Sequence, residues 1–198
     1  MMRAHLYMLG AALFDEPRPE HHDALRALMW RVIYRSPVDA RWVPPLLEIA
    51  DTYEHADELR AEYARLFILG KPKVLAQPYG SYWLENEQTL MSRSTAEVRA
   101  LMRHHGVDVD RRSGLLPDHL VSELEFMAYL ADHHALESTL TTQATLLHEH
   151  LAVWVPRFAA ALRACEPPLF YRMAAHFLRE VIAWDYRRVP APSRTIAA

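Results

Sequence analysis

The sequence has a single cysteine, five glycines among 198 residues and no long apolar run. The lone Cys165 excludes an intrachain disulfide and is typical of a protein in a reducing compartment. Few glycines, with 51% hydrophobic residues, favour a helical globular protein over a sheet-rich one. No segment approaches the roughly 20 apolar residues of a membrane span, so we expect no stable membrane insertion.

An excess of charge of one sign is also absent. The formal net charge is -3 and no run of like charges forms a tail, which argues against nucleic acid as the main partner. The apolar segment Leu6–Phe14 follows Arg3, but it is short, contains Gly10, and leads into Asp15 without a small-residue cleavage site. We therefore interpret it as the first core helix rather than a secretory signal, and expect a cytoplasmic protein.

Catalytic motifs are missing as well. We find no phosphate-binding loop, dinucleotide fingerprint or nucleophile elbow. Twelve histidines form no His-x-x-x-His and no Glu-x-x-His pair, which excludes the di-iron bundle motif. His119 and Glu123 are a helical pair that could begin a metal site, but two ligands are too few. We expect no metal and no cofactor, with a metal-dependent helical-bundle enzyme as an alternative.

Apolar residues recur at helical spacing through most of the chain. The stripes that predict helices span Leu25–Ile33, Leu59–Phe67, Val98–Met102, Leu140–Ala161 and Leu169–Trp184. Ser94 and Glu97 fit a capping box at the start of the third of these, and Pro156 should kink the fourth. The prediction is an all-α, single-domain helical bundle over residues 1–188, followed by a flexible tail over residues 189–198.

The stretch Gly114–Leu130 has the strongest local pattern, GLLPDHLVSELEFMAYL. Pro117 suits a first helical position, and Asp118 would then face the positive end of the helix dipole. An apolar stripe follows, formed by Leu120, Leu124, Met127 and Leu130. His119 and Glu123 share a different face. The pattern predicts a buried helix with a polar cluster at its mouth.

The segment Gly70–Met91 is interrupted by prolines and Gly80, and we expect a long irregular loop. It carries Tyr79, Tyr82 and Trp83 close together, followed by Glu85 and Glu87. These aromatic side chains could line an apolar groove with acidic groups at one end. Alternatively, they simply pin the loop onto the core.

Three blocks of the sequence resemble the TorD/DmsD/NarJ family of molybdoenzyme chaperones. They are PDHL followed by ELEFM, EYARLF followed by PYGSYWLE, and HLAVWVPRF. Leu116 stands where the family usually has an acidic residue. The resemblance implies a TorD-like bundle and a cytoplasmic redox enzyme maturation protein that is not an enzyme. It would bind the twin-arginine leader, the apo form, or both, of a molybdenum-cofactor oxidoreductase catalytic subunit, assisting maturation and preventing premature export.

The resemblance also implies a peptide-binding site. Its residues would be Tyr79, Gly80, Ser81, Trp83, Asp118, His119, Leu120 and Glu123. Aromatic surface would bind the apolar part of the leader, and carboxylates of Asp118, Glu123, Glu85 or Glu87 would pair with its arginines.

His119 with an ordinary pKa of about 6.5 would make leader binding pH-sensitive. We expect a monomer or a helix-swapped homodimer, with Val107–Ser113 as the hinge. The remaining alternative is a structural helical adaptor without leader recognition.

Overall fold

The computed structural model describes residues 2–52, 56–69, 74, 76–85, 89–133 and 137–192. That part of the chain is helical, and its one β feature is the isolated bridge between Tyr79 and His119, which confirms the all-α prediction. None of its helices is long and apolar enough to cross a membrane. Gly70, Pro72, Glu87 and tail residues 193–198 lie outside the described residues.

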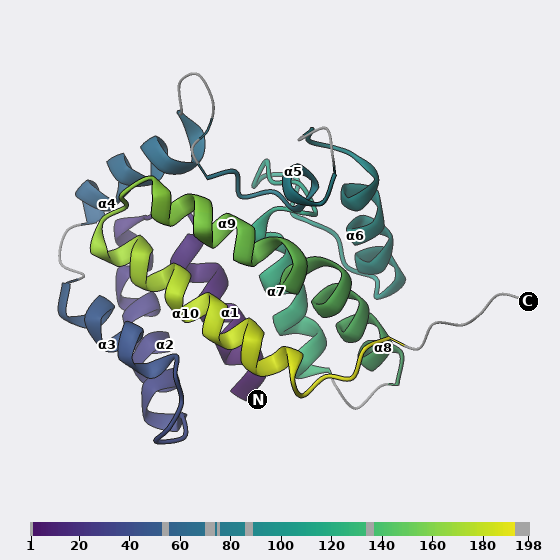
Figure 1. Cartoon of the computed structure of the whole chain (residues 1–198), viewed down its shortest axis with the longest axis horizontal. Helices are drawn as coiled ribbons and strands as arrows, with labels where there is room; N and C mark the ends of the chain where they lie inside the picture. The colour runs from purple at the N-terminus through teal and green to yellow at the C-terminus, as the bar shows by residue number, and fades with distance from the viewer. Residues whose placement is uncertain are drawn as a thin grey trace, which may run out of the picture.

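The helices follow one another along the whole described chain (Figure 1). They are α1 (Met2–Phe14), α2 (His22–Arg35), α3 (Val43–Thr52), α4 (Ala56–Tyr63), α5 (Gly80–Leu84), α6 (Arg93–His104), α7 (Leu120–Asp132), α8 (Glu137–Thr145), α9 (Ala152–Ala164) and α10 (Leu169–Tyr186). Two π-helical segments, Ala64–Ile68 and Leu146–Leu151, extend α4 and join α8 to α9, and a 3-10 turn covers Pro19–His21.

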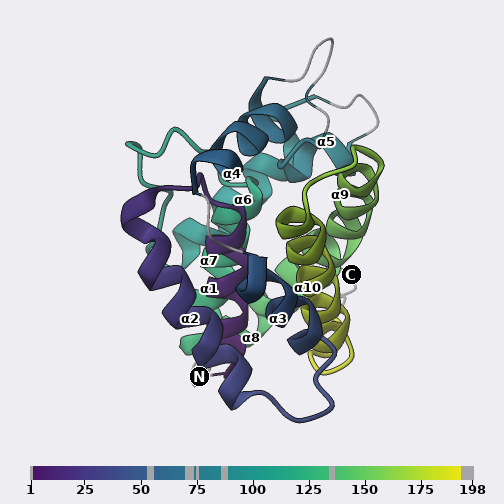
Figure 2. The same cartoon turned by 90° about the vertical axis from the view of Figure 1, so that its left-hand side faces the viewer.

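The core is built around α7, which packs along α1 (Figures 1 and 2). The predicted stripe of α7 is confirmed, because Leu120, Leu124, Met127 and Leu130 are all fully buried. α1 also contacts α2 and α10, and α10 packs against α3 and α9. The N-terminal apolar segment is therefore a core helix, as its short length predicted.

The expected long seam covers α8, the π-helical segment and α9. Leu147, Trp154 and Phe158 on it are fully buried, but Leu140 is half exposed, so the seam does not extend to its predicted start. Pro156 lies inside α9, and the departure from regular α-helical geometry precedes it, at Leu146–Leu151. Pro156 has no N–H to donate to the Ala152 carbonyl, and that carbonyl lies just after the π-helical segment.

The predicted capping box at Ser94 is wrong. Helix α6 begins at Arg93, and the N-cap residue Ser92 makes no side-chain capping bond. Glu97 instead bonds Arg93 at 2.7 Å. The carboxylate of Glu85, from the segment after α5, accepts a hydrogen bond from the Ser94 N–H at 3.1 Å. Glu85, which lies outside α6, thus accepts a hydrogen bond from a backbone N–H at the start of that helix, as the capping box was expected to do. This hydrogen bond lowers the pKa of Glu85.

Candidate functional site

Helix α7 begins at Leu120, three residues later than the proline pattern predicted. Pro117 and Asp118 form a turn and His119 is extended, because this segment pairs with the residues around Tyr79. Gly80 N–H donates to the Asp118 carbonyl and Leu120 N–H to the Pro78 carbonyl, both at 2.8 Å. His119 is consequently the N-cap residue, and its Nδ1 accepts a hydrogen bond from the Val121 N–H at 3.2 Å.

The segment that was expected to be wholly irregular contains the short helix α5. Oδ2 of Asp118 accepts a hydrogen bond from the Ser81 N–H at 2.9 Å, in the first turn of α5. A free backbone N–H at a helix start is stabilised by a carboxylate. Asp118 therefore joins the start of α5 to the start of α7, a role that its position in the sequence does not reveal.

Glu123 brings a third helix to this point. Its Oε2 accepts a hydrogen bond from the indole N–H of Trp154 on α9 at 3.2 Å. Gly80 packs closely against Glu123 and Trp154. A Cβ atom added at Gly80 would lie 2.9 Å from Oε1 of Glu123 and 3.2 Å from Nε1 of Trp154. Sequence periodicity placed Trp154 in the core but gave no sign of this polar contact.

The polar side chains of this cluster are shielded from solvent. Asp118, Ser81 and Glu123 are fully buried, and His119 is 3% exposed. Burial raises the pKa of Glu123 well above its usual value and lowers the pKa of His119 to about 4. The expectation of an ordinary histidine pKa is therefore wrong. His119 is neutral at physiological pH because its ring is desolvated.

Three oxygens in the cluster have no hydrogen-bond partner among the described residues. They are Oγ of Ser81, Oδ1 of Asp118 and Oε1 of Glu123. Buried polar atoms of folded proteins are nearly always paired. Unpaired acceptors are therefore concentrated where α5, α7 and α9 meet.

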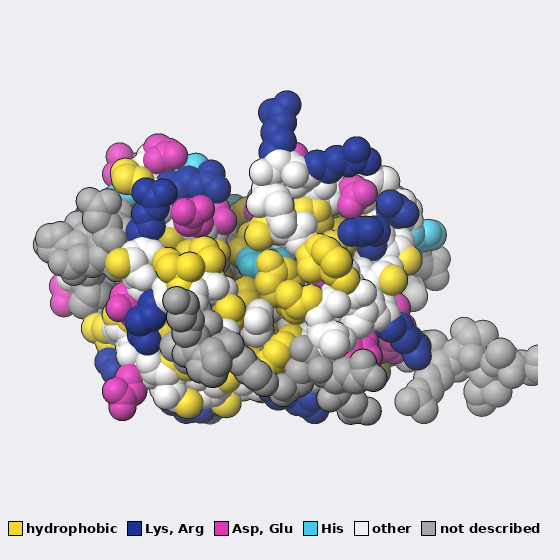
Figure 3. All heavy atoms as spheres, turned by 90° about the horizontal axis from the view of Figure 1, so that it is seen from above, with side chains coloured by type: hydrophobic (Ala, Val, Ile, Leu, Met, Phe, Trp, Pro, Cys, Tyr) yellow, Lys and Arg dark blue, Asp and Glu magenta, His cyan; other side chains and the backbone are white. Residues whose placement is uncertain are grey.

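The aromatic residues occupy the outer side of this cluster and are partly exposed. The ring of Tyr79 meets the ring of His119 edge-on, with centroids 4.9 Å apart. Trp83 donates from Nε1 to the Gln77 carbonyl at 2.7 Å and contacts the ring of Tyr82. Figure 3 looks onto this end of the molecule and shows apolar side chains gathered between charged ones, with a histidine among them. The aromatic residues thus both hold the segment and present apolar surface.

The structure therefore brings most of the predicted site residues together. Tyr79, Gly80, Ser81, Asp118, His119 and Glu123 meet directly, Leu120 is buried beneath them, and Trp83 lies at the far end of α5. The carboxylates expected to meet arginines are inaccessible at Asp118 and Glu123. Glu85 is engaged with α6, and Glu87 lies outside the described residues.

An acidic cavity of about 360 Å³ flanks another side of α7. Val121, Phe126 and Tyr129 of α7 contribute apolar surface. The carboxylates that line it belong to Asp15, Asp108, Asp110 and Glu125, and the one cation is Arg18. Burial raises the pKa of Glu125, and nearby Asp15 raises it further. Sequence reasoning missed this cavity, because its acids come from three separate segments.

No group of three or more histidine, cysteine, aspartate or glutamate side chains in the described part of the chain could hold a metal ion. In the one pair considered above, Nδ1 of His119 accepts from Val121 and Oε2 of Glu123 accepts from Trp154. Both atoms thus have structural partners.

The chain matches a family model described as nitrate reductase delta subunit over residues 34–160. The Tat proofreading chaperone DmsD of Salmonella typhi is 31% identical over 160 residues, covering 76% of this chain and 72% of DmsD. The chaperone protein TorD of Vibrio cholerae (El Tor Inaba N16961) is 31% identical over 135 residues, covering 65% of this chain and 60% of TorD. The chain belongs to this family.

The fold agrees with a solved structure. A crystal structure described as that of a redox enzyme maturation protein from Archaeoglobus fulgidus superposes with a TM-score of 0.62 at 22% identity. The match covers 92% of this chain and 94% of the other. The resemblance found in the sequence and the TorD-like fold are thus confirmed, and the chain is a member of a chaperone family rather than an enzyme.

Proposed function

We propose that the protein is a cytoplasmic chaperone for a molybdenum-cofactor oxidoreductase. It binds the twin-arginine leader, the apo form, or both, of the catalytic subunit, assists its maturation and prevents premature export. The observation that carries this proposal is that the family match over residues 34–160 contains the whole junction of α5, α7 and α9. Relatives matched over the same chain are named as a Tat proofreading chaperone and as TorD.

The site divides into contacting and supporting residues. Tyr79 and Trp83 are partly exposed and would contact the apolar part of the leader, which supplies most of the affinity. Asp118, His119 and Glu123 are buried, so they act by holding the Tyr79–Trp83 segment in place. Gly80, Ser81 and Leu120 belong to this support as well.

The arginines of the leader need accessible carboxylates, which the acidic cavity beside α7 offers. Asp15 and Glu125 lie in it above the apolar surface of Phe126 and Tyr129. Arginine pairs with carboxylates through two parallel hydrogen bonds, which fixes orientation as well as adding affinity. Acidic groups beside apolar surface match a leader with a basic start followed by apolar residues.

Calorimetric titration with twin-arginine leader peptides from the same organism's molybdoenzymes tests the proposal. We expect binding at about micromolar affinity or tighter to one leader and none to a scrambled peptide of equal charge. The double variant Asp118→Ala plus His119→Ala should bind more weakly with unchanged helix content. Asp132 and His133, an exposed pair at the other end of α7, give the matched control variant.

Unchanged affinity in a folded Asp118→Ala plus His119→Ala variant would remove these residues from the site. If no leader binds to the wild-type protein, leader recognition is wrong, and a helical adaptor is favoured.

Metal content of protein purified without a histidine tag tests the bundle-enzyme alternative. We further propose a monomer or a dimer swapped at Val107–Ser113, which light scattering distinguishes by mass.

A further inference from the structure

Helix α10 carries a row of exposed arginines along one side. Arg172, Arg179 and Arg187 are exposed and are spaced by seven and eight residues, which is about 10 and 12 Å along the helix. Arg163, at the end of α9, is exposed as well. None of the four guanidinium groups has a hydrogen bond or ion pair within the part of the chain that the structure describes. Arginines are free there to bind an external group.

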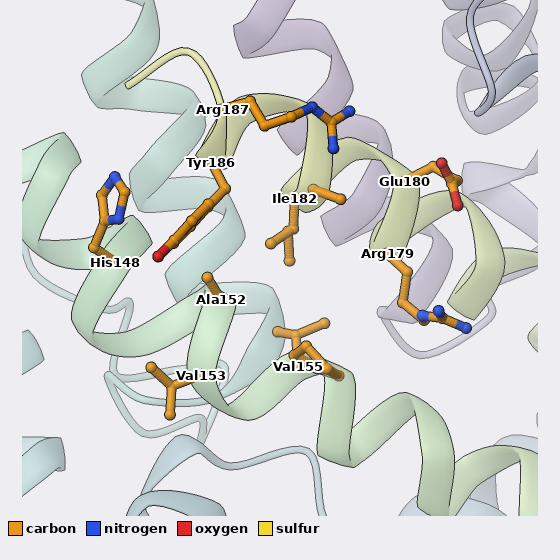
Figure 4. A pocket seen from close by; sticks show the side chains of 11 residues that line it. His148, Ala152, Val153, Val155, Arg179, Glu180, Ile182, Tyr186 and Arg187 are labelled. Carbon is orange, nitrogen blue, oxygen red and sulfur yellow. The ribbon is translucent and has the colours of Figure 1, made fainter. Parts of the chain in front are cut away.

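A groove with two adjoining cavities lies between α9 and α10, and we call it the α9–α10 groove. The cavities measure about 410 and 310 Å³ and share Arg179 in their walls. Figure 4 shows Val155 and Ile182 facing each other across the larger cavity, with His148 and Tyr186 at one end. The smaller cavity is lined by Leu162 and Met173, among others. Val155 and Leu162 are fully buried in the walls, so the accessible apolar surface beside the arginines comes from Val153, Tyr186 and Met173.

The charge of the α9–α10 groove is opposite to that of the chain as a whole. Its walls hold four arginines and one carboxylate, Glu180, whereas the whole chain has a formal net charge of -3. Glu180 itself lies 3.8 Å from the His176 ring. A basic leader peptide would be repelled here, so the natural occupant carries negative charge.

We propose that the α9–α10 groove docks an acidic, amphipathic segment of the mature part of the client apoprotein. This inference rests on the proposed function for the identity of the partner, and it adds a contact separate from the leader site. Carboxylates at two-turn intervals on a client helix would pair with Arg172 and Arg179. Apolar side chains on the same face would enter the two cavities, as amphipathic helices do in grooves.

A polypeptide suits this surface better than a lipid bilayer does. Interfacial membrane binding uses projecting apolar side chains that enter the acyl region beside cations. Here Val155 and Ile182 are buried, Val153 and Tyr186 are the large hydrophobic side chains of the larger cavity that are exposed, and the space available lies in cavities between two helices. Side chains of a docked segment can fill such cavities.

The test uses each of the organism's molybdoenzyme catalytic subunits, produced without leader and without cofactor. We expect the wild-type chaperone to bind at least one of them, more weakly as salt is added. Arg172→Glu plus Arg179→Glu should weaken this binding by about tenfold or more, with leader-peptide affinity unchanged. Arg26→Glu plus Arg35→Glu, two exposed arginines on α2, makes the same charge change elsewhere and should bind like wild type.

Equal binding of leaderless apoprotein by the two charge-reversed variants would overturn the groove assignment. So would a wild-type chaperone that binds a leader but no leaderless subunit, and in that case the proposed function stands. Failure to bind any leader, with arginine-dependent binding of a leaderless subunit, would support the groove and refute leader recognition. Arginine-dependent binding to phosphatidylglycerol vesicles, without apoprotein binding, would assign the groove to a membrane and overturn the inference.

Discussion

Arg3, near the start of the first helix, and Asp185, near the end of the last, form a bidentate ion pair inside the bundle. Nε and Nη2 of Arg3 lie 2.7 and 2.8 Å from the two carboxylate oxygens. Asp185 is fully buried and also accepts a hydrogen bond from the Tyr7 hydroxyl at 2.7 Å. Nη1 of Arg3 donates to Gln143 on α8. One arginine thus links α1, α8 and α10.

Replacing Arg3 by alanine should destabilise the fold strongly. The Arg3 side chain is 23% exposed and Asp185 is 0% exposed, so the substitution leaves a buried carboxylate with Tyr7 as its remaining partner. Removing one member of a buried pair costs about 3 kcal/mol or more of unfolding free energy. Urea unfolding followed by circular dichroism measures this change.

The exposed pair Arg93–Glu97 supplies the matched control for Arg3→Ala. Its N–O distance is also 2.7 Å, but the Arg93 side chain is 84% exposed. Arg93→Ala should therefore leave the urea midpoint unchanged, since exposed pairs contribute little. Equal midpoints for the two variants would show that burial of Asp185 does not determine the contribution of this ion pair.

His119 should titrate well below neutral pH. Burial lowers its pKa from 6.5 to about 4, so the unfolded chain binds a proton there that the folded chain does not. The stability that the neutral ring contributes is present above pH 6.5 and is lost as pH falls toward 4. A ¹H–¹⁵N NMR titration of the ring should show no protonation of His119 between pH 6 and 8. An inflection near pH 6.5 would mean that the ring is exposed in solution.

The fold could be predicted to a large extent because helical periodicity is a local signal. The spacing of Leu120, Leu124 and Met127 alone placed a core helix. The start of that helix could not be predicted in the same way, because backbone bonds with Pro78 and Gly80, some forty residues earlier, hold Asp118 in a turn and His119 extended. The backbone pairing with Pro78 and Gly80 therefore determines where α7 begins, although Pro117 is favoured in the first turn of a helix.

The sequence predicted residues that the structure brings together, but it did not predict their accessibility. The resemblance implied that the carboxylates of Asp118 and Glu123 would pair with arginines of a leader, and carboxylates are rarely fully buried. Their burial depends on α5, a short helix that no periodicity reveals, and on the Trp154 indole from α9. The acidic cavity was missed for a related reason, since Asp15 and Glu125 are close only in the folded chain.

Gly80→Ala should disturb the contact between α5 and α7. The added methyl would lie 2.9 Å from Oε1 of Glu123, closer than such atoms approach, and 3.2 Å from Nε1 of Trp154, which is a tight contact. The buried Glu123 carboxylate must shift away from the Trp154 indole or α5 must move outward, and such overpacking costs about 1–3 kcal/mol. Thermal unfolding should show the loss of stability, and leader titration should show weaker binding because Tyr79 moves with the segment.

Gly10→Ala is the comparison for Gly80→Ala. Its added methyl would lie 3.4 Å from side-chain atoms of Leu124 and Leu178, and alanine is favoured over glycine inside a helix. We therefore expect stability near that of wild type at this buried glycine. A Gly80→Ala protein as stable as the Gly10→Ala protein would mean that the Glu123 side chain yields without cost.

Glu123→Gln should stabilise the protein at alkaline pH. Burial raises the pKa of Glu123 well above its ordinary value of 4.5, so folding favours the protonated carboxyl. This contribution is fully present below about pH 4.5 and is lost as pH rises through the folded-state pKa. Glutamine keeps an oxygen for the Trp154 indole and has no charge to desolvate. The melting temperature of the variant should exceed that of wild type at pH 8 and equal it at pH 4.5.

Glu123→Ala separates the charge from the hydrogen bond. Compared with Glu123→Gln, it leaves the Trp154 indole N–H without its acceptor, which costs about 1–3 kcal/mol at every pH, or about 2–4 °C in melting temperature for each kcal/mol. If Glu123→Gln instead lowers the melting temperature at pH 8, the carboxylate is stabilised as an anion in solution. Its free Oε1 must then have a cation as a partner, and Glu123 would bind a charged ligand directly rather than support the segment that does.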